Sequence, residues 1–274
     1  MRKYKVDFLY RPGLNYSDEK LQELISELQE VASCCFDELP NYQCISGSRE
    51  ELSDKVITIA RNDKGKLIGF CSAVLLPIPG MGSIFHLGLT CVLPQARGFG
   101  LTHVLTSKVL VKYLLFYRPI GCQWISNVAC VLSSLGNCSI YFRDIYPSPF
   151  FTTPSETHKK IAETINNQYR KKIHIDAEAN FDDKNFVFRG SVKNTVFQKE
   201  ADDLRFFHRQ KYVNNYYKSI INFEEGDEVL QIGHISLFEG AKYFLKRALS
   251  INTIERQIQD AMALANLSDA KGKF

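Results

Sequence analysis

The sequence predicts an α/β (α+β) protein with a mixed, mostly antiparallel sheet flanked by helices. Three observations lead to this class. Short β-rich runs separated by turn residues fill much of the first half of the chain. Two segments among them carry apolar residues at helical spacing instead. The chain has 274 residues, of which 45% are hydrophobic, so it is large enough and apolar enough to bury a sizeable core.

The expected elements follow in the order β–α–β–β–β–α–β–α. The first helix has Ser17 as its N-cap, and the stretch 62–66 forms the turn of a hairpin. The strand expected at 83–92 is apolar almost throughout, as in a central strand covered on both faces. The elements are a strand at 5–10, a helix at 18–37, strands at 56–61, 67–76 and 83–92, a helix from about 98 to 118, a strand at 124–129 and a helix at 132–142.

Residues 1–149 are expected to form this core, and residues 150–274 a C-terminal α/β extension. The extension has helical patterns at 156–172 and 239–266, and strand patterns at 186–190 and 228–235. It is predicted to pack on the core as a substrate-binding lobe or a dimerisation element. A second copy of the core with a degenerate site is the alternative.

Charge and cysteine usage exclude several classes of partner. Lys and Arg outnumber Asp and Glu by only 34 to 30 and are dispersed, so no nucleic-acid partner is expected. The longest apolar stretch, 104–117, contains two lysines and is too short to span a bilayer. No charged-then-apolar leader is present, which favours a cytoplasmic location, with leaderless secretion as the alternative. None of the eight cysteines has C-x-x-C spacing, so no metal is expected.

The most informative segment is 92–101 (VLPQARGFGL), between the apolar strand and the second helix. A strand–glycine turn–helix unit gathers unpaired backbone N–H groups and the positive end of a helix at one point, which suits an anion. Gly98 and Gly100 let the main chain approach phosphates closely, and Arg97 can bind two oxygens. The alternative is a turn that needs glycine only to fit.

The pattern V-x-P-x-x-R-G-x-G-L resembles the acyl-CoA motif of the GNAT superfamily of N-acetyltransferases. The order of the elements over about residues 3–146 also resembles that fold. A dinucleotide-binding fold would instead place G-x-G-x-x-G after its first strand. The resemblance implies a splayed central strand pair, formed by the ends of strands 83–92 and 124–129. It also implies acetyl-CoA as co-substrate, whose pantetheine arm would enter between the two strands.

The family pattern Q/R-x-x-G-x-G/A can be read in two registers here. Read from Gln95 it matches fully, whereas read from Arg97 its last position is Thr102. The Arg97 register keeps Val92 and Pro94 where the family has them and is preferred. The resemblance then implies that backbone groups of Cys91 and Val92 pair with the pantetheine amides and that an N–H near Val92 serves the oxyanion. The expected cofactor-binding residues are Cys91, Val92, Arg97, Gly98, Phe99, Gly100, Leu101, Thr102 and Asn127.

Acyl transfer to an amine also needs proton transfer, because a lysine-like amine of pKa ~10.4 is protonated at neutral pH. His86 on the central strand is the candidate base, with a hydrogen-bonded structural histidine as the alternative. By the resemblance, a tyrosine on the helix after the fifth strand protonates the thiolate. Tyr141 is the candidate there, Tyr146 is a second choice, and a core tyrosine is the alternative. Cys91 as an acyl-carrying nucleophile is a further option.

The resulting hypothesis is an N-acetyltransferase that moves an acetyl or other short acyl group from acyl-CoA to a primary amine. The acceptor is a small molecule or a protein, and a homodimer is compatible with the extension. The alternative is a non-catalytic acyl-CoA-binding sensor or interaction module, which the threonine at 102 favours.

Overall fold

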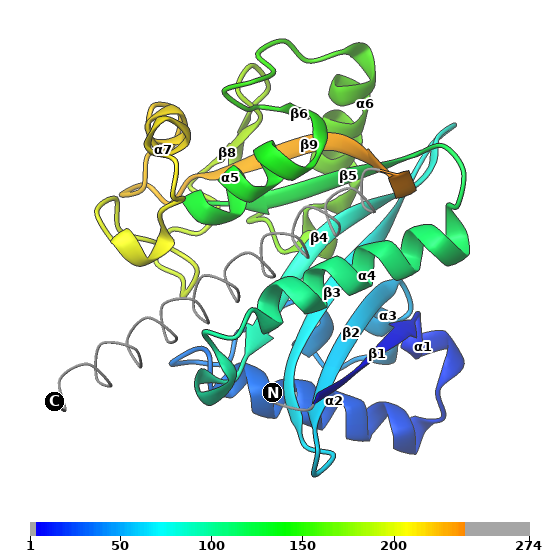
Figure 1. Cartoon of the computed structure of the whole chain (residues 1–274). Helices are drawn as coiled ribbons and strands as arrows, with labels where there is room; N and C mark the ends of the chain where they lie inside the picture. Colours follow the sequence, from blue (N-terminus) through cyan, green and yellow to red (C-terminus); the bar gives the residue numbers. More distant parts are fainter. Residues whose placement is uncertain (1–3, 239–274) are drawn as a thin grey trace, which may run out of the picture.

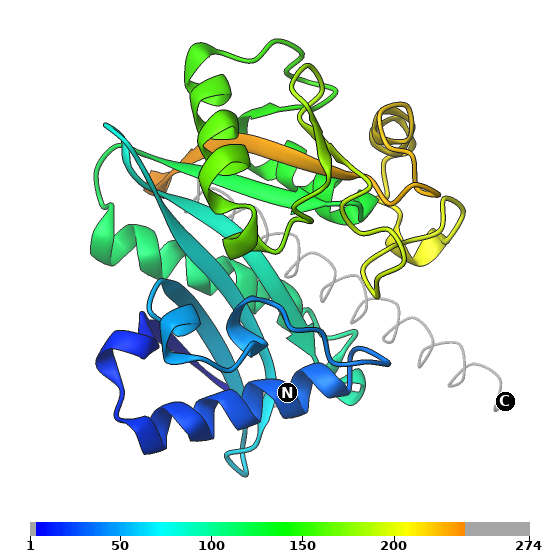
Figure 2. The same ribbon diagram turned by 180° about the vertical axis from the view of Figure 1, so that it is seen from behind.

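The computed structural model describes residues 4–238, so the predicted helices at 239–266 lie outside the described residues (Figures 1 and 2). Within this range nine strands form one sheet in the order β1-β2-β3-β4-β5-β9-β8-β7, and β6 also pairs with β9. The strands are β1 (Tyr4–Tyr10), β2 (Lys55–Asn62), β3 (Leu67–Ile78), β4 (Gly82–Val92), β5 (Cys122–Ala129), β6 (Arg143–Tyr146), β7 (Asn180–Asp182), β8 (Val187–Arg189) and β9 (Glu228–Ser236).

The helices of the first half confirm the predicted order. Ser17 caps α2, accepting a hydrogen bond from the Lys20 N–H, but this helix ends at Ser33, earlier than expected. Two short helices, α1 and α3, were not predicted. The helices of the described chain are α1 (Pro12–Asn15), α2 (Asp18–Ser33), α3 (Arg49–Leu52), α4 (Leu101–Tyr117), α5 (Leu132–Tyr141), α6 (Glu156–Thr164) and α7 (Lys211–Lys218).

The helices cover the two faces of the sheet in separate groups. Figure 1 shows α4 and α5 in front of the sheet, and Figure 2, from behind, shows α2, α3 and α6 on the opposite face. The largest buried cluster joins α2 and α4 to strands β2–β4. A second cluster lies under α6 and includes Leu230 and Ile232 of β9. Within residues 4–238, no helix is long and apolar enough to cross a bilayer.

Strands β4 and β5 are parallel but stay paired only briefly. Their register runs from Phe85 opposite Ile125 to Leu87 opposite Asn127, although β4 continues to Val92. The pairing of β3 with β4 is irregular at the same level, since the register shifts beside Gly88. Such an extra residue bends the strand that carries it. The predicted splayed central strand pair is therefore confirmed.

Strand β9 joins the second half of the chain to the first. It runs antiparallel to β5 along the whole of that strand, from Cys122 opposite Ser236 to Ala129 opposite Val229. Its other edge pairs with β6 and β8. The predicted boundary between 149 and 150 therefore does not divide the sheet. Residues 147–227 form an insertion between β6 and β9, and its helix α6 stops at Thr164, short of the predicted range 156–172.

Candidate active site

The turn between β4 and α4 has the backbone that the glycine pattern predicts. After β4 the chain makes one 3₁₀ turn at Pro94–Ala96, and Gly98 and Gly100 then have φ angles of 82° and 73°. These are left-handed conformations that side chains rarely adopt. A Cβ atom added to Gly98 would meet no atom within 4 Å. The glycine at 98 is thus required by the backbone conformation, and the space above it is open.

Helix α4 begins without a side-chain cap. Its N-cap is Gly100, which has no side chain to offer, and a hydrogen bond at this end joins the Val104 N–H to the Gly100 carbonyl at 3.2 Å. In any helix, the N–H groups of the first turn have no carbonyl one turn earlier within that helix. Together with the helix dipole they favour a phosphate-like anion above the turn.

Arg97 is exposed, and its side chain is held against the end of β4. Its Nε donates to the Val92 carbonyl at 3.0 Å, and the Cys35 thiol donates to the same carbonyl at 3.4 Å. A hydrogen bond to Cys91 and the nearby Arg97 lower the pKa of Cys35 to about 6, against the effect of burial. The same contact, with burial, raises the pKa of Cys91. A positive charge and an acidic thiol therefore flank the end of the splayed strand.

Five other predicted cofactor-binding residues lie in two environments, the surface and the core. Phe99 is 62% exposed and Thr102 lies on the surface of the first turn of α4. Leu101 is buried in the main core, as are Cys91 and Val92, whose partners across β3 are Phe70 and Gly69. Only the backbone of these buried residues can face a ligand.

Asn127 lies across the opening, at the last paired position of β5. Its Nδ2 donates to Gln231 Oε1 at 3.1 Å. Gln231 in turn donates to the Tyr217 hydroxyl at 2.6 Å, and that hydroxyl donates to the Pro147 carbonyl at 2.9 Å. The predicted asparagine therefore anchors a buried network between β5, β9 and the insertion.

His86 is buried, and its Nδ1 lies 2.9 Å from Ser126 Oγ on β5. Burial, helped by the charge of Lys55, lowers the pKa of His86 to about 3. A histidine with this pKa is neutral at physiological pH but is a weak base. The structural role that sequence analysis left open fits these contacts.

The predicted acid and nucleophile occupy different surroundings. Tyr141 is the last residue of α5, and a helix rise of about 1.5 Å per residue puts it roughly 13 Å along the axis from Leu132, which follows the end of β5. The Tyr146 hydroxyl donates to the Lys184 carbonyl. For Cys91, the raised pKa disfavours the thiolate that a nucleophile requires.

The face opposite α4 carries residues that sequence analysis did not select. The loop after α2 lies against β4 there, and Gln43 is fully buried with its N–H donating to His174 Nε2 at 2.7 Å. A Cβ at Gly88 would lie 2.2 Å from Gln43 Oε1, so the bulged strand must have glycine at this point. The rings of Tyr42 and His174 lie against each other at a tilt of 34°, with centroids 4.7 Å apart. No local pattern could reveal these contacts, since Gln43 and His174 are far apart in sequence.

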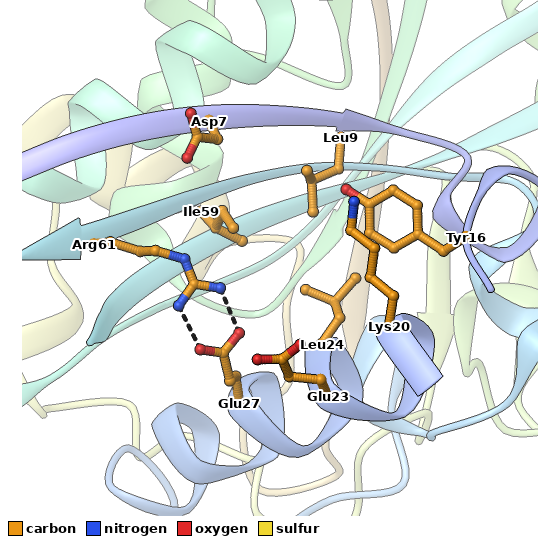
Figure 3. Close-up of a pocket in the computed structure, with 9 residues that line it drawn as sticks. All are labelled: Asp7, Leu9, Tyr16, Lys20, Glu23, Leu24, Glu27, Ile59 and Arg61. Atoms are coloured by element: carbon orange, nitrogen blue, oxygen red, sulfur yellow. Dashed lines mark hydrogen bonds and ion pairs between the residues drawn. The ribbon is translucent and has the colours of Figure 1, made fainter. Parts of the chain in front are cut away.

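A pocket of the described chain lies elsewhere, between α2 and strands β1 and β2 (Figure 3). It has a volume of about 240 Å³. Asp7, Glu23 and Glu27 line it with two cations, and Figure 3 shows Arg61 held by both oxygens of Glu27. This excess of carboxylates opposes an anionic ligand. Among residues 4–238 no group of three or more His, Cys, Asp or Glu side chains could hold a metal ion.

No family model matches the sequence, and no curated protein matches it. Part of the fold is similar to solved acetyltransferase structures. A ribosomal-protein-alanine N-acetyltransferase from Brucella melitensis biovar Abortus is 20% identical over 41% of this chain and 72% of that chain, with a TM-score of 0.29. An acyl-CoA N-acyltransferase from Pseudomonas aeruginosa is 17% identical over 51% and 82%, with a TM-score of 0.35. A GNAT family acetyltransferase from Brucella melitensis, solved with acetyl-CoA, is 15% identical over 46% and 76%, with a TM-score of 0.34.

These likenesses are partial, and the assignment of the fold rests on the chain's own architecture. The antiparallel strands β1–β4 are followed by a parallel β4–β5 contact. The strand pair opens beyond Leu87 and Asn127, and β4 leads into the glycine turn of α4. In this order and with this opening, the described chain has the mixed, mostly antiparallel fold with a splayed strand pair that its resemblance to the GNAT superfamily of N-acetyltransferases predicts.

Proposed function

We propose that this protein transfers an acetyl or other short acyl group from acyl-CoA to a primary amine of a small molecule or a protein. The observation that carries the proposal is the continuity of β4 with the α4 turn. The strand leaves β5 after Leu87 and runs directly into a helix N-terminus that no side chain caps. The opening between the strands and the proposed anion site therefore follow one another along the chain.

Each part of acyl-CoA has a chemical counterpart along this path. The edge of β4 beyond Leu87, no longer paired with β5, can pair with the pantetheine amides as a neighbouring strand would. The N–H groups of the α4 turn can hold the pyrophosphate, and Arg97 lies beside them as a fixed positive charge. Thr102, exposed on the first turn, can add a hydroxyl donor.

In the transfer step, the amine nitrogen attacks the thioester carbonyl carbon, the C–S bond breaks, and the thiolate leaves as the amide forms. A backbone N–H near Val92 would stabilise the oxyanion. Tyr141 stays the proposed acid for the thiolate. A Tyr141→Phe variant with lower kcat and unchanged acetyl-CoA affinity would support that role, and an unchanged kcat would remove it.

The test is release of free thiol from acetyl-CoA in the presence of a panel of primary amines, with acetyl-CoA affinity measured separately by calorimetry. Turnover with at least one amine is expected from the wild-type chain. Gly100→Val should lose acetyl-CoA binding while keeping the wild-type circular dichroism spectrum. Wild-type affinity in this variant would contradict the assignment of the cofactor site.

A non-catalytic acyl-CoA sensor is the second candidate. The observation that favours it is the weak basicity of His86, whose pKa of about 3 leaves the predicted base ineffective. This alternative predicts that acetyl-CoA binds with micromolar affinity while no amine in the panel accelerates thiol release.

A further inference from the structure

Strand β9 brings an acidic residue to the open end of the β4–β5 pair. Glu228 is its first residue, one position beyond the pair formed by Val229 and Ala129. Neighbouring strands lie about 4.8 Å apart, so the residue starts one strand spacing from the end of β5. Because β4 and β5 are parallel, this is the level at which β4 has already separated from β5.

The direction of the side chain follows from the alternation of β9. Leu230 and Ile232 contribute to the buried cluster under α6, and Glu228 has the same parity along the strand. Val229 contributes instead to the cluster with α5 and α7. Glu228 therefore belongs to the face opposite α4, the face on which Tyr42 and Gln43 lie.

The carboxylate of Glu228 is held by one neutral group. Ser191 Oγ donates to its Oε2 at 2.7 Å, the one hydrogen bond to this carboxylate within the described part of the chain. The preceding residue makes a useful contrast. Asp227 pairs with Arg189 at 2.6 Å and also accepts from the N–H groups of Gly190 and Asn222. Asp227 is a structural ion, whereas Glu228 forms no ion pair with any residue of the range 4–238.

This environment changes the proton affinity of Glu228. Desolvation raises its pKa to about 7, only partly offset by the Ser191 hydrogen bond. The titratable groups around it are Tyr42 from the loop after α2 and Cys130 from the end of β5. Burial and then the charge of Glu228 raise the pKa of both, that of Cys130 to about 12, while Lys199 acts on Cys130 in the opposite sense. Glu228 is the group of this set that changes charge near neutrality.

We propose that Glu228, placed on β9 beside the opening between β4 and β5, accepts the proton of the acceptor's ammonium group, which gives this protein its general base. The inference rests on the acyltransferase function proposed above. The Glu228 carboxylate takes one proton from R–NH₃⁺. The neutral amine then forms the C–N bond as the C–S bond breaks. The thiolate takes a proton from Tyr141, which recovers one from the nitrogen, so the products are the amide, free CoA thiol and protonated Glu228, which returns its proton to solvent.

Residues of the insertion contact Glu228 and the groups around it. Phe197 packs on Tyr42 with centroids 4.8 Å apart, and its carbonyl accepts the Cys130 thiol at 3.3 Å. Ser191 belongs to the same insertion. The segment that supplies the hydrogen bond to Glu228 therefore also closes over the end of β5. A cationic amine that enters on this face meets a carboxylate in a desolvated setting, where the attraction is stronger than in water.

The experiment compares Glu228→Gln with Glu224→Gln, which removes an exposed carboxylate from the turn just before β9. Thiol release is followed with acetyl-CoA and two probe amines, ethylamine and the less basic trifluoroethylamine. Glu228→Gln should lower kcat/KM for ethylamine about 100-fold at neutral pH, as expected for loss of a general base. Acetyl-CoA affinity should stay unchanged, and Glu224→Gln should match the wild type.

Two further readouts separate a base from a structural residue. The wild-type kcat/KM for ethylamine should rise with pH and level off near pH 7, and this levelling should disappear in Glu228→Gln. The defect should shrink at least tenfold with trifluoroethylamine, which is already neutral and needs no base. Equal defects for both amines, or an unchanged pH profile, would overturn the role of Glu228.

A measurement without turnover completes the test. Carbon NMR of labelled glutamate side chains, assigned by loss of the signal in Glu228→Gln, should show this carboxyl titrating near pH 7. Titration below pH 5 would overturn the inference. Absence of wild-type turnover with every amine would refute the acyltransferase function itself, whereas an undiminished kcat/KM for ethylamine in Glu228→Gln would refute only the base.

Discussion

His86 and Ser126 join β4 to β5 at the level where the two strands are still paired, with Nδ1 and Oγ 2.9 Å apart. The contact is buried and lies one residue before the last registered pair. Beyond it the strands separate. The polar bridge therefore marks the closed end of the opening, and its histidine stays neutral because protonation would place a charge in the core.

Lowering the pH should destabilise the folded protein through His86. The pKa of His86 is lowered from 6.5 to about 3, so between these values the unfolded chain binds a proton that the folded chain does not. Its neutral state is favourable above pH 6.5, and stability is lost as pH falls. Between pH 7 and pH 5 the loss from this group is about 2 kcal/mol. We expect the free energy of unfolding, measured with urea at pH 7 and pH 5, to differ by about 2 kcal/mol less in His86→Asn than in the wild type. Equal pH dependence in the two proteins would contradict the assignment, and Ser126→Ala, which keeps the histidine, should retain it.

Gly98 and Gly65 form a matched pair for testing the cofactor turn. Both have φ near 80°, and a Cβ at either would meet nothing within 4 Å. Alanine at each should therefore cost a similar 1–2 kcal/mol, roughly, through left-handed strain alone. Gly98→Ala should also weaken acetyl-CoA binding at least tenfold, because its methyl group occupies the open space above the turn. Gly65→Ala, in the β2–β3 hairpin, should bind as the wild type does. Calorimetry decides, and equal affinities would exclude this backbone from the site.

Cys35 should react as a thiolate near neutral pH. Its pKa is lowered to about 6 by the hydrogen bond with Cys91 and by Arg97. Alkylation by iodoacetamide, followed at Cys35 by peptide mass spectrometry, should accelerate up to about pH 6 to 7 and then level off. Arg97→Gln should move this transition to higher pH. A rate that keeps rising beyond pH 8 in the wild type would contradict the environment described.

Asp227, the residue just before β9, should contribute measurably to the stability of the fold. Asp227→Asn removes the ion pair with Arg189, although Asp182 remains as a second partner of that arginine. We expect a loss of about 2 kcal/mol in the free energy of unfolding. Glu225→Gln breaks an exposed pair with Lys193 in the same turn and should change stability by less than about 0.5 kcal/mol. Similar effects of the two substitutions would show that burial does not distinguish these acids.

The sequence by itself determined the elements of the first half and the glycine turn. Apolar periodicity and turn residues are local properties, so β2, β3, β4 and α4 could be placed within a few residues. The conformation at Gly98 and Gly100 is likewise set by residues that are adjacent in the chain. The opening between β4 and β5 was expected from the resemblance that this turn carries, and Leu87 and Asn127 now fix where it begins.

The tertiary structure decided what surrounds that opening. Glu228 stood in the sequence among Glu224, Glu225 and Asp227, with nothing local to set it apart. Its position depends on β9 pairing with β5 across a long insertion, and its pKa is raised by burial in the folded chain. His86 is the converse case, since its residue type favoured catalysis while burial and Ser126 give it a structural setting. Strand pairing and desolvation both arise between segments distant in sequence, which is why local patterns indicate the glycine turn but not the position of Glu228.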